Sequence, residues 1–541
     1  MGKQEKIYGY LIDQPLPDIS LGQSIMNKMH EYSDTVFLID GCNNDYRLTY
    51  RDLLEKSVKL AKFMQRYGIK IGDRIAIVSE NRLEWLIALC ATLYIGAIFA
   101  PYNPTYTEWE FRHVLNISEP RIVFVSQRTE ETFTKLQPSL SWQIELIELD
   151  DKPFAANMRT LTNILNDEKV ADFLKYKTVN IGDIKKHPAV LLNSSGTTGL
   201  PKAVALSHRN LLTLLLKVSK RDFLDITQDT RSLIFLPFYH GFAFATLLIS
   251  LTVGANVMVM SNFQPERFLK LVQKYKPTFL PIVPSIMTLL AKHPLVERND
   301  FRSLREILCG GSPLGKELVD AVKARIGDIY IRNGYGMTEL TVLTSVSAYE
   351  ESDVTALHCI VPGLCSKIVD IETQKTLDVD QVGEVCFKGD QIMMMYWNNP
   401  EATKQTIDED GWLHTGDLGY YNEHGAMYVV DRLKELIKYN GYQVSPSEIE
   451  MVLLSHPAVR DATVCGRPDP RSGELPTAVI VKQPGATVTA ENIMEFVKQK
   501  LSPHKWLRGG VQFVDAIPKN ATGKSLRREV QLMIQATVSK L

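Results

Sequence analysis

The chain has 541 residues, of which 45% are hydrophobic and 23% charged, and its formal net charge is −1 at pH 7. This length is too great for one hydrophobic core, so we expect two to four domains in a globular protein of ordinary composition. The balanced charge gives no electrostatic case for nucleic acid or anionic membranes as partners. Seven cysteines without Cys-x-x-Cys spacing are typical of a reducing compartment and argue against disulfides and zinc.

Short apolar runs alternate with helical patterns through most of the chain. Strands are predicted over 74–78, 121–125, 189–192, 204–206, 278–280 and 305–309, and a helix is predicted over 85–93. This alternation predicts α/β layers with largely parallel strands. Ligands bind such sheets beyond the carboxyl ends of strands. Two glycine-containing segments lie at predicted strand exits: Gly310, Gly311, Ser312 and Pro313, and Gly334, Tyr335 and Gly336.

Two apolar stretches, 85–101 and 241–260, are long enough to be compared with membrane spans. The first is interrupted at Gly96, and the second at Gly254, after which it becomes rich in Val and Met. A span needs about 20 uninterrupted apolar residues. We therefore predict no transmembrane segment, and expect a helix, a turn and a buried strand over 241–260.

A change of pattern near residues 431–434 predicts a domain boundary. We expect an N-terminal domain over 1–431 and a C-terminal lobe over 432–541, which is a usual domain size. In the lobe, Ser445 and Glu448 form a predicted capping box around Pro446, and a second helix is expected over 490–501. The predicted fold is α/β, with a large N-terminal region of several subdomains and a smaller, mobile α+β lobe.

The run Ser194-Ser195-Gly196-Thr197-Thr198-Gly199-Leu200-Pro201-Lys202 is the most informative in the chain. Its glycines let successive N–H groups face one hollow, while hydroxyls and the Lys202 ammonium add donors. It is not the GxxxxGK[ST] phosphate loop, because no Lys directly follows the second glycine. Predicted buried strands on both sides distinguish it from a flexible Ser/Gly linker. The run therefore predicts a polyphosphate site.

This loop resembles the phosphate loop of the adenylate-forming superfamily, which includes acyl-CoA synthetases, coumarate-CoA ligases and beetle luciferases. Five motifs in family order extend the resemblance over nearly the whole chain, and it is greatest to insect luciferase-like acyl-CoA synthetases. The resemblance implies ATP, Mg²⁺ and coenzyme A as cofactors. Joining a carboxylate to the α-phosphate of ATP brings two anions together, which requires Mg²⁺, fixed N–H donors and a mobile cation.

The motif 335–339 (YGMTE) implies roles for three residues. Tyr335 would stack on adenine, Thr338 would donate to the α-phosphate, and the Glu339 carboxylate would hold Mg²⁺ as a hard oxygen ligand. Taken alone, this motif is equally typical of a surface turn. Its place after the phosphate loop favours the functional interpretation.

For two further motifs, the resemblance implies contacts with the ribose and a catalytic role. In 412–417 (WLHTGD), Asp417 would accept hydrogen bonds from the ribose hydroxyls, and Arg432 matches the ribose-binding arginine at the lobe boundary. In 518–524 (PKNATGK), Lys524 would be the catalytic cation of adenylation. Surface turns, salt bridges and a solvated lysine are the alternatives for these residues.

Two more segments bear on the second substrate and the acid. Residues 435–443, with Lys438, Gly441 and Tyr442, resemble the segment that faces the active site during thioester formation, after the lobe rotates about Lys434. Asn440 stands where Lys is usual and still permits a left-handed turn. His240, in 238–242 (FYHGF), would lie between the carboxylate pocket and the thiol path. Without the motif, a core histidine is the more common interpretation.

Three departures from the family pattern replace glycines. Ala203 follows the phosphate loop, Thr355 to His358 replace a Gly-Ser-x-Gly turn, and Met394-Met395 replace Lys-Gly. We expect strain of about 1 kcal/mol or more wherever such a residue needs a positive φ.

The resemblance implies an acyl-CoA synthetase that converts a fatty or aryl acid to its adenylate and then to acyl-CoA, releasing pyrophosphate and AMP. The aliphatic run 340–343 (LTVL) replaces a small polar stretch of beetle luciferases and favours an alkyl chain. A luciferin monooxygenase and a catalytically weak nucleotide-binding paralogue are the alternatives. The final residues Ser539-Lys540-Leu541 match a peroxisomal address, so we expect an import receptor as partner and a peroxisomal location.

Overall fold

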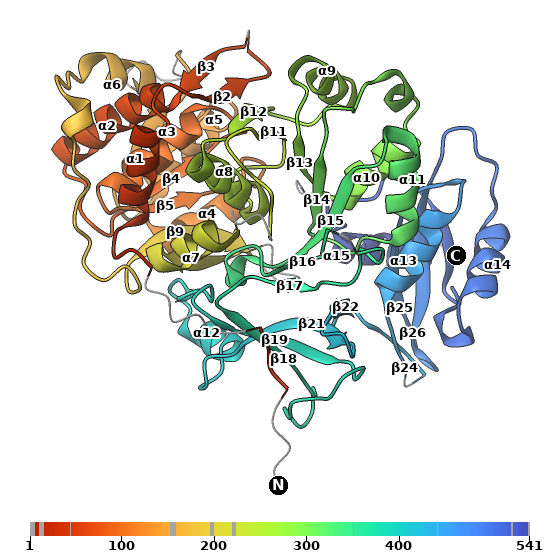
Figure 1. The fold of residues 1–541 in the computed structure, drawn as a ribbon. Helices are drawn as coiled ribbons and strands as arrows, with labels where there is room; N and C mark the ends of the chain where they lie inside the picture. Colours follow the sequence, from red (N-terminus) through yellow and green to blue (C-terminus); the bar gives the residue numbers. More distant parts are fainter. Residues whose placement is uncertain are drawn as a thin grey trace.

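The computed structural model describes residues 6–9, 16–43, 45–151, 158–194, 200–218, 223–349, 351–440, 442–520 and 523–538. Figure 1 shows two large α/β layers, a small sheet below them, and a separate C-terminal lobe beside α10 (Pro284–Lys292) and α11 (Lys316–Ile326). Among the helices of these described residues, none has the length and apolar character needed to cross a membrane.

The first layer is an eight-stranded sheet with a parallel centre. Ile75 and Ile77 face a core shared with α2 (Tyr50–Tyr67) and α3 (Glu84–Tyr94). The alternate residues Ala76 and Val78 face α4 (Glu108–Ser118) and α5 (Glu130–Leu136), as the two-residue period of a strand requires. Burial on both faces explains the continuous apolar runs. The strand order is β20 (Met395–Tyr396), β10 (Lys202–Ser207), β9 (Pro188–Ser194), β5 (Ile98–Pro101), β4 (Arg74–Val78), β6 (Ile122–Val125), β7 (Glu145–Glu148) and β8 (Arg159–Thr160).

The second layer is a nine-stranded sheet. Helices α1 (Leu21–Glu31), α7 (His208–Val218) and α8 (Gly241–Val253) share one hydrophobic core with α3 and strands of both sheets. The strand order is β17 (Cys359–Ile360), β16 (Ser345–Val346), β15 (Tyr330–Tyr335), β14 (Glu306–Gly310), β13 (Phe279–Ile282), β11 (Arg231–Ile234), β12 (Asn256–Val259), β2 (Val36–Asp40) and β3 (Arg47–Thr49). β14 and β15 are parallel and end at Gly310 and Tyr335, so both predicted strand exits lie at the same edge.

A small antiparallel sheet follows, with the order β1 (Tyr8–Gly9), β18 (Leu364–Val369), β19 (Gly383–Gly389), β21 (Leu413–Tyr421) and β22 (Met427–Arg432). The N-terminal segment joins this sheet, where Tyr8 stacks on Tyr421 with ring centroids 3.5 Å apart. Helix α12 (Pro400–Thr406) precedes β21. β21 and β22 lead directly to the C-terminal lobe.

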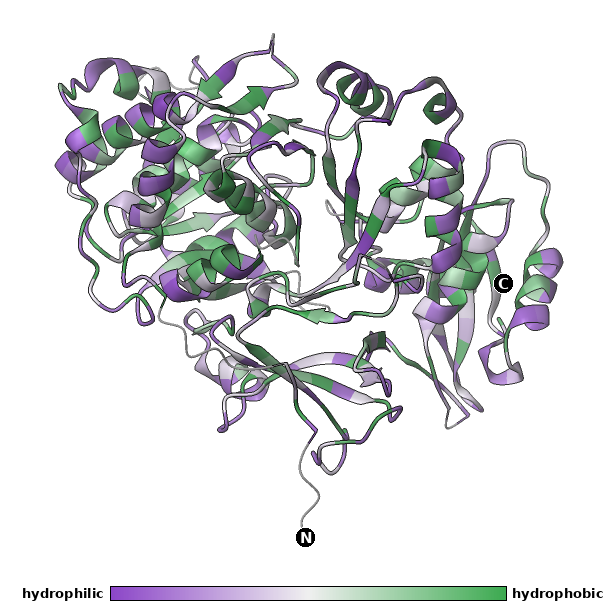
Figure 2. Cartoon of the chain, viewed as in Figure 1, coloured by the Kyte–Doolittle hydropathy of each residue, from purple (hydrophilic) through white to green (hydrophobic). Residues whose placement is uncertain are grey.

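The C-terminal lobe has its own hydrophobic core, built on Val464, Ile480 and their neighbours. Figure 2 shows the apolar faces of its helices turned toward its sheet and polar faces turned outward. The predicted α/β fold with a large N-terminal region and a smaller lobe is confirmed. The lobe contains β23 (Ile437–Tyr439), β24 (Tyr442–Val444), α13 (Pro446–Ser455), β25 (Val459–Asp469), β26 (Gly473–Lys482), α14 (Ala490–Lys500), β27 (Gly510–Phe513) and α15 (Arg527–Val538).

Local predictions agree with these elements except at one cap. The stretch 241–260 is a helix, a left-handed turn at Gly254 (φ 80°) and the buried strand β12. Ser445 caps α13 by accepting a hydrogen bond from the Glu448 N–H at 3.2 Å. The reciprocal half of the predicted capping box is wrong, because the Glu448 carboxylate pairs with the Lys505 ammonium at 2.6 Å instead.

Candidate active site

A cavity of about 810 Å³ lies where the two large layers, the small sheet and the C-terminal lobe meet. It gathers predicted residues from segments far apart in the sequence, and the β14 and β15 exits form part of its wall. The predicted residues that line it are Ser194, Lys202, His240, Gly310, Gly311, Gly334, Tyr335, Gly336, Thr338, Glu339, Arg432 and Lys524.

Glu339 and Lys202 are linked through a residue that the sequence did not single out. The Tyr396 hydroxyl donates to Glu339 Oε1 at 2.8 Å, and the Lys202 ammonium lies 4.2 Å from the centre of the Tyr396 ring. Glu339 is buried, and its carboxylate is the oxygen donor that Mg²⁺ prefers. Glu339 therefore suits the predicted magnesium ligand, with Tyr396 fixing its orientation.

Tyr335, Asp417 and Arg432 form a connected polar group at the small sheet. The Tyr335 hydroxyl donates to Asp417 Oδ2 at 2.7 Å, and Arg432 Nε lies 3.2 Å from Asp417 Oδ1. Burial raises the pKa of Asp417, and the Arg432 guanidinium opposes that rise. Asp417 is not among the residues that line the cavity, and both of its carboxylate oxygens have protein partners.

A tight turn beneath the cavity explains why Gly336 is a glycine. A Cβ atom at this position would lie 1.8 Å from the Val342 carbonyl oxygen. The turn also places Thr341 (φ 53°) and Val342 (φ 79°) in the left-handed region, which β-branched residues rarely adopt. Of the aliphatic run 340–343, Val342 and Leu343 line the cavity. Local strain of this kind is stored where it serves a site.

His240 is held in one orientation at the start of α8. Its Nδ1 accepts a hydrogen bond from the Phe242 N–H at 3.4 Å, which leaves Nε2 as the protonated nitrogen of the neutral ring. Burial and the Lys524 ammonium lower the pKa of His240 to about 4. A neutral histidine at physiological pH can donate a hydrogen bond from Nε2 without adding charge to the cavity.

Lys524 enters the cavity from the C-terminal lobe. Burial, followed by the charge of Arg432, lowers its pKa to about 8, while Glu435 and Asp417 act in the opposite direction. Its neighbour Gly523 has φ 82°, and a Cβ atom there would lie 2.8 Å from Ser285 Oγ in α10. This close approach lets the lobe bring Lys524 to the same cavity that Lys202 lines.

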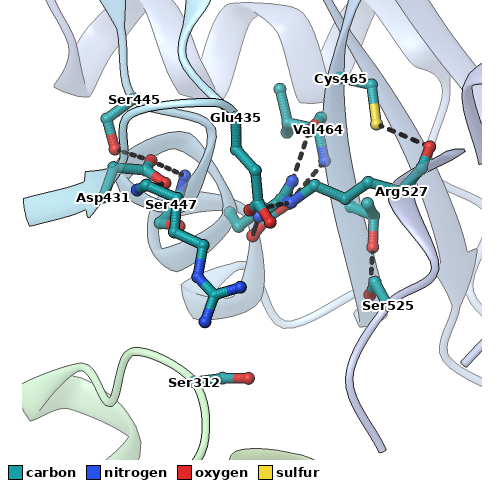
Figure 3. A network of polar contacts seen from close by, with 12 residues as sticks. Ser312, Asp431, Glu435, Ser445, Ser447, Val464, Cys465, Ser525 and Arg527 are labelled. Atoms are coloured by element: carbon teal, nitrogen blue, oxygen red, sulfur yellow. Dashed lines mark hydrogen bonds and ion pairs between the residues drawn. The ribbon is translucent and has the colours of Figure 1, made fainter. Parts of the chain in front are cut away.

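A polar network holds the lobe at the boundary segment (Figure 3). Asp431, at the end of β22, accepts hydrogen bonds from the Ser447 N–H at 3.1 Å and the Ser445 hydroxyl at the start of α13. Arg527 binds Glu435 Oε2 at 2.7 Å and both carboxylate oxygens of Glu450, at 2.6 and 3.0 Å. The network thereby joins the boundary segment to α13 and α15.

A second contact fixes the lobe from the other side. The Lys292 ammonium, at the end of α10, donates to the carbonyl oxygens of Leu454 at 3.0 Å and Val459 at 2.8 Å. Leu454 lies in the last turn of α13, where a cation satisfies free carbonyl groups. Together with Gly523 on Ser285, these contacts define one docked arrangement of the lobe.

Several predicted residues do not line the cavity. Ser312 and Pro313 continue beyond the β14 exit, and Lys438 and Tyr442 are exposed on the β23–β24 hairpin. Asn440, between them, has the expected left-handed conformation with φ 46°. Other predicted residues lie outside the described residues: Ser195, Gly196, Thr197, Thr198, Gly199 and Gly441, and the terminal Ser539, Lys540 and Leu541.

The prediction of backbone strain at the replaced glycines is wrong. Ala203, residues 355–358, and Met394 and Met395 all lie outside the left-handed region. Ala203 accepts a hydrogen bond from the Trp397 N–H at 2.7 Å, and Leu357 exchanges backbone hydrogen bonds with Met427. A Cβ atom is therefore tolerated at these positions, and the departures give no physical reason for weak activity.

The comparisons with known proteins show the family of the chain. The sequence matches the AMP-binding enzyme family over residues 26–397 and the AMP-binding enzyme C-terminal domain over residues 448–524. A luciferin 4-monooxygenase from Luciola mingrelica is 37% identical over 546 residues, covering 100% of both chains. The 4-coumarate–CoA ligase 2 of Nicotiana tabacum is 35% identical over 551 residues, covering 99% of both. ATP-bound MatB from Rhodopseudomonas palustris superposes with a TM-score of 0.84 at 26% identity, covering 95% of this chain and 99% of that one. The predicted resemblance is confirmed.

Replacing Arg527 by Gln should destabilise the docked lobe. The change leaves the partly buried Glu435 and Glu450 without their shared cation, and the loss should be at most about 3–5 kcal/mol, which is the cost of breaking a fully buried ion pair. Urea unfolding followed by fluorescence measures the loss. The exposed neighbour Arg528 provides the matched control, because Arg528→Gln should leave the midpoint unchanged. Equal midpoints for the two variants would show that the Arg527 contacts do not stabilise the C-terminal lobe.

Proposed function

The chain belongs to the AMP-binding enzyme family, and on that premise we propose that it is an acyl-CoA synthetase. It would activate a fatty or aryl acid as the acyl-adenylate and then transfer the acyl group to coenzyme A. The observation that carries this proposal is that Lys524 and Lys202, from separate lobes, line one cavity with Glu339 and His240. That arrangement supplies the charges on which adenylation depends.

In the first step, the acid's carboxylate attacks the α-phosphorus of ATP and pyrophosphate leaves. Lys524 balances the negative charge where the two anions meet, and Lys202 extends positive charge along the phosphates. Thr338, beside Glu339, is placed to donate a hydrogen bond to the α-phosphate. Mg²⁺ would be held by Glu339, where it would neutralise phosphate charge. The ordering of Glu339 by Tyr396 costs no reorganisation during the reaction.

The acid would lie deeper in the cavity, against His240 and an apolar wall. His240 can donate from Nε2 to the carboxylate, because its Nδ1 is occupied by the Phe242 N–H. The wall behind it includes Leu236, Phe242, Leu308, Val342 and Leu343. An alkyl chain or a plain aryl ring suits such a surface, since apolar pockets discriminate by shape.

In the second step, the coenzyme A thiol attacks the carbonyl carbon and AMP leaves, with the thiol proton passing to solvent. We propose that the lobe rotates about Lys434 between the steps and brings the β23–β24 hairpin to the cavity. The exposure of Lys438 and Tyr442 in the docked arrangement supports this proposal. Rotation would also withdraw Lys524 once the adenylate has formed.

Luciferin oxidation is the second candidate function, favoured by the similarity to luciferin 4-monooxygenases. A panel of medium-chain, long-chain and cinnamate-like acids with MgATP and coenzyme A tests the ligase directly. Luciferin with MgATP tests the alternative through light emission. Acid-dependent pyrophosphate exchange in the panel supports the ligase, whereas no exchange with any acid would favour a non-catalytic nucleotide-binding protein.

Lys524→Ala should abolish adenylation while largely sparing thioester formation from supplied acyl-AMP. The variant removes the cation needed in the first step, and Lys524 has no part in the second step once the lobe has rotated. Pyrophosphate exchange and acyl-CoA production from acyl-AMP measure the two steps separately. Equal loss of both would refute the division of roles.

The adenylation rate should fall on the alkaline side of pH 8. The pKa of Lys524 is lowered to about 8, so its ammonium loses its charge as the pH rises through that value. The quantity to measure is kcat/KM for pyrophosphate exchange, which reports groups of the free enzyme. Lys524→Arg, which stays charged, should be slower but should lack this alkaline decline. The same decline in both proteins would assign it to another group.

We also propose a peroxisomal location on the basis of the terminal Ser539-Lys540-Leu541. Deleting Leu541 removes the receptor-recognised address and should leave a fluorescently tagged protein in the cytosol. The tag belongs at the N-terminus, so that the C-terminus stays free. Unchanged peroxisomal puncta in the truncated protein would contradict the proposal.

A further inference from the structure

Beside the nucleotide end of the cavity, the small sheet brings together a glutamate, a cysteine and a histidine. Cys386 of β19 and His414 of β21 are directly opposite each other in the antiparallel register. Glu384 lies two residues before Cys386, where an irregularity in the β19–β21 pairing shifts the register. Such irregularities redirect side chains next to active sites. We call Glu384, Cys386 and His414 the sheet triad.

The donor atoms of the sheet triad are spaced as metal ligands would be. All of them lie within 4.8 Å of one another. His414 Nδ1 is 3.5 Å from Cys386 Sγ and 2.8 Å from Glu384 Oε2. A tetrahedral zinc ion, with bonds of about 2.0–2.3 Å, holds its ligand atoms roughly 3.3–3.5 Å apart. The His414 Nδ1 and Glu384 Oε2 atoms, now 2.8 Å apart, would therefore have to move slightly apart to admit the ion.

Outer contacts orient the ligands. The Gly416 N–H donates to Glu384 Oε1 at 2.9 Å, which leaves Oε2 directed at His414. Asp408 Oδ2 lies 3.6 Å from His414 Nε2, on the side of the ring away from the triad, while Asp408 Oδ1 accepts from the Trp412 N–H at 2.8 Å. A carboxylate behind the other nitrogen is the usual support of a metal-bound histidine.

Charge and access are also suitable. Two deprotonated ligands, the Glu384 carboxylate and the Cys386 thiolate, would balance the charge of a divalent ion. Binding of the ion would displace two protons, one from the Cys386 thiol and one from His414 Nδ1, which faces Glu384 Oε2 at 2.8 Å. Cys386 is buried, but Glu384 and His414 line the cavity, so a fourth ligand position would open toward it.

We propose that the sheet triad is a regulatory site for Zn²⁺ or a similar thiophilic divalent cation, and that its occupation inhibits adenylation. The inhibitory part rests on the proposed function. Its physical basis is the connection from Glu384 to Gly416, whose neighbour Asp417 holds both Tyr335 and Arg432. If Glu384 moves to bind an ion, its hydrogen bond with the Gly416 N–H is disturbed. The neighbouring Asp417, which holds Tyr335 and Arg432 at the proposed nucleotide end of the cavity, would then shift.

Cobalt substitution tests the site without any assay of activity. Co²⁺ added to the purified full-length protein should produce a thiolate-to-cobalt charge-transfer band, and Zn²⁺ should remove that band stoichiometrically. Cys386→Ser should lack the band. Cys365→Ser is the matched control, since Cys365 is another buried cysteine of the same small cluster, and this variant should retain the band. Asp408→Asn should keep the band but bind about 10- to 100-fold more weakly.

Absence of the band in the unaltered protein, or its persistence in Cys386→Ser, would overturn the site. X-ray absorption at the zinc edge of the unaltered protein needs no variant, and should show one sulfur ligand among nitrogen and oxygen ligands. If Cys386→Ser fails to fold, this measurement decides instead, and a sulfur-free zinc environment would refute the proposal.

Pyrophosphate exchange tests the inhibition. Zn²⁺ should inhibit exchange by the unaltered protein at saturating Mg²⁺, a chelator should reverse the effect, and Cys386→Ser should be at least about tenfold less sensitive. Equal sensitivity in both proteins would place inhibition at another site, such as Glu339, and overturn the regulatory role. Failure of the proposed function has a different signature, because exchange would then be absent without Zn²⁺ while the cobalt band would still report the site.

Discussion

The constraint on which the proposed function depends is that two anions must come together inside one cavity. A carboxylate and a triphosphate repel each other, so the cavity needs cations that do not also block entry. Lys202 begins β10, the strand next to the edge strand β20 of the eight-stranded sheet, whereas Lys524 comes from a separate lobe and reaches the cavity by docking. If the lobe moves as proposed, placing one cation on it would allow substrates to enter before the positive charge is complete.

The contacts between the lobe and the rest of the chain should therefore be specific but few. Asp431 accepts hydrogen bonds from the first turn of α13, and Lys292 binds carbonyl oxygens at its other end. Burial would raise the pKa of Glu435, but the charges of Arg527, Lys524 and Arg432 outweigh it and lower the pKa. Glu435 thus stays ionised beside the Lys524 ammonium. A few charge-assisted contacts hold the lobe without a large apolar interface that would resist rotation.

The acyl end of the cavity is governed by backbone sterics instead of charge. Gly336 can only be a glycine because the Val342 carbonyl oxygen occupies the place of its Cβ atom. This turn holds Val342 at a positive φ and exposes its side chain to the cavity. The substrate-facing surface is therefore coupled to the YGMTE segment, which also carries Thr338 and Glu339. Changes of acid preference at Val342 must preserve the same backbone turn.

Local patterns in the sequence determined much of this protein. The strand at 74–78, the helix–turn–strand unit at 241–260 and the Ser445 cap depend on neighbouring residues, so periodicity and turn chemistry predicted them. The predicted phosphate loop and Lys524 could be singled out from the sequence because each lies in a contiguous motif. The departures at Ala203 and Met394-Met395 were misjudged, because the φ of a residue depends on the strands that pair with it.

Tertiary structure alone decided which distant groups meet. The bond from Tyr396 to Glu339, the Arg527 network and the meeting of Cys386 with His414 join residues 57, 77 to 92, and 28 positions apart in the chain. The spacing of the cysteines argued against zinc. Spacing reports only ligands that are close in sequence, so it could not indicate the sheet triad. Sheet register brings Glu384, Cys386 and His414 together. Register is set by long-range strand pairing, which a single sequence does not display.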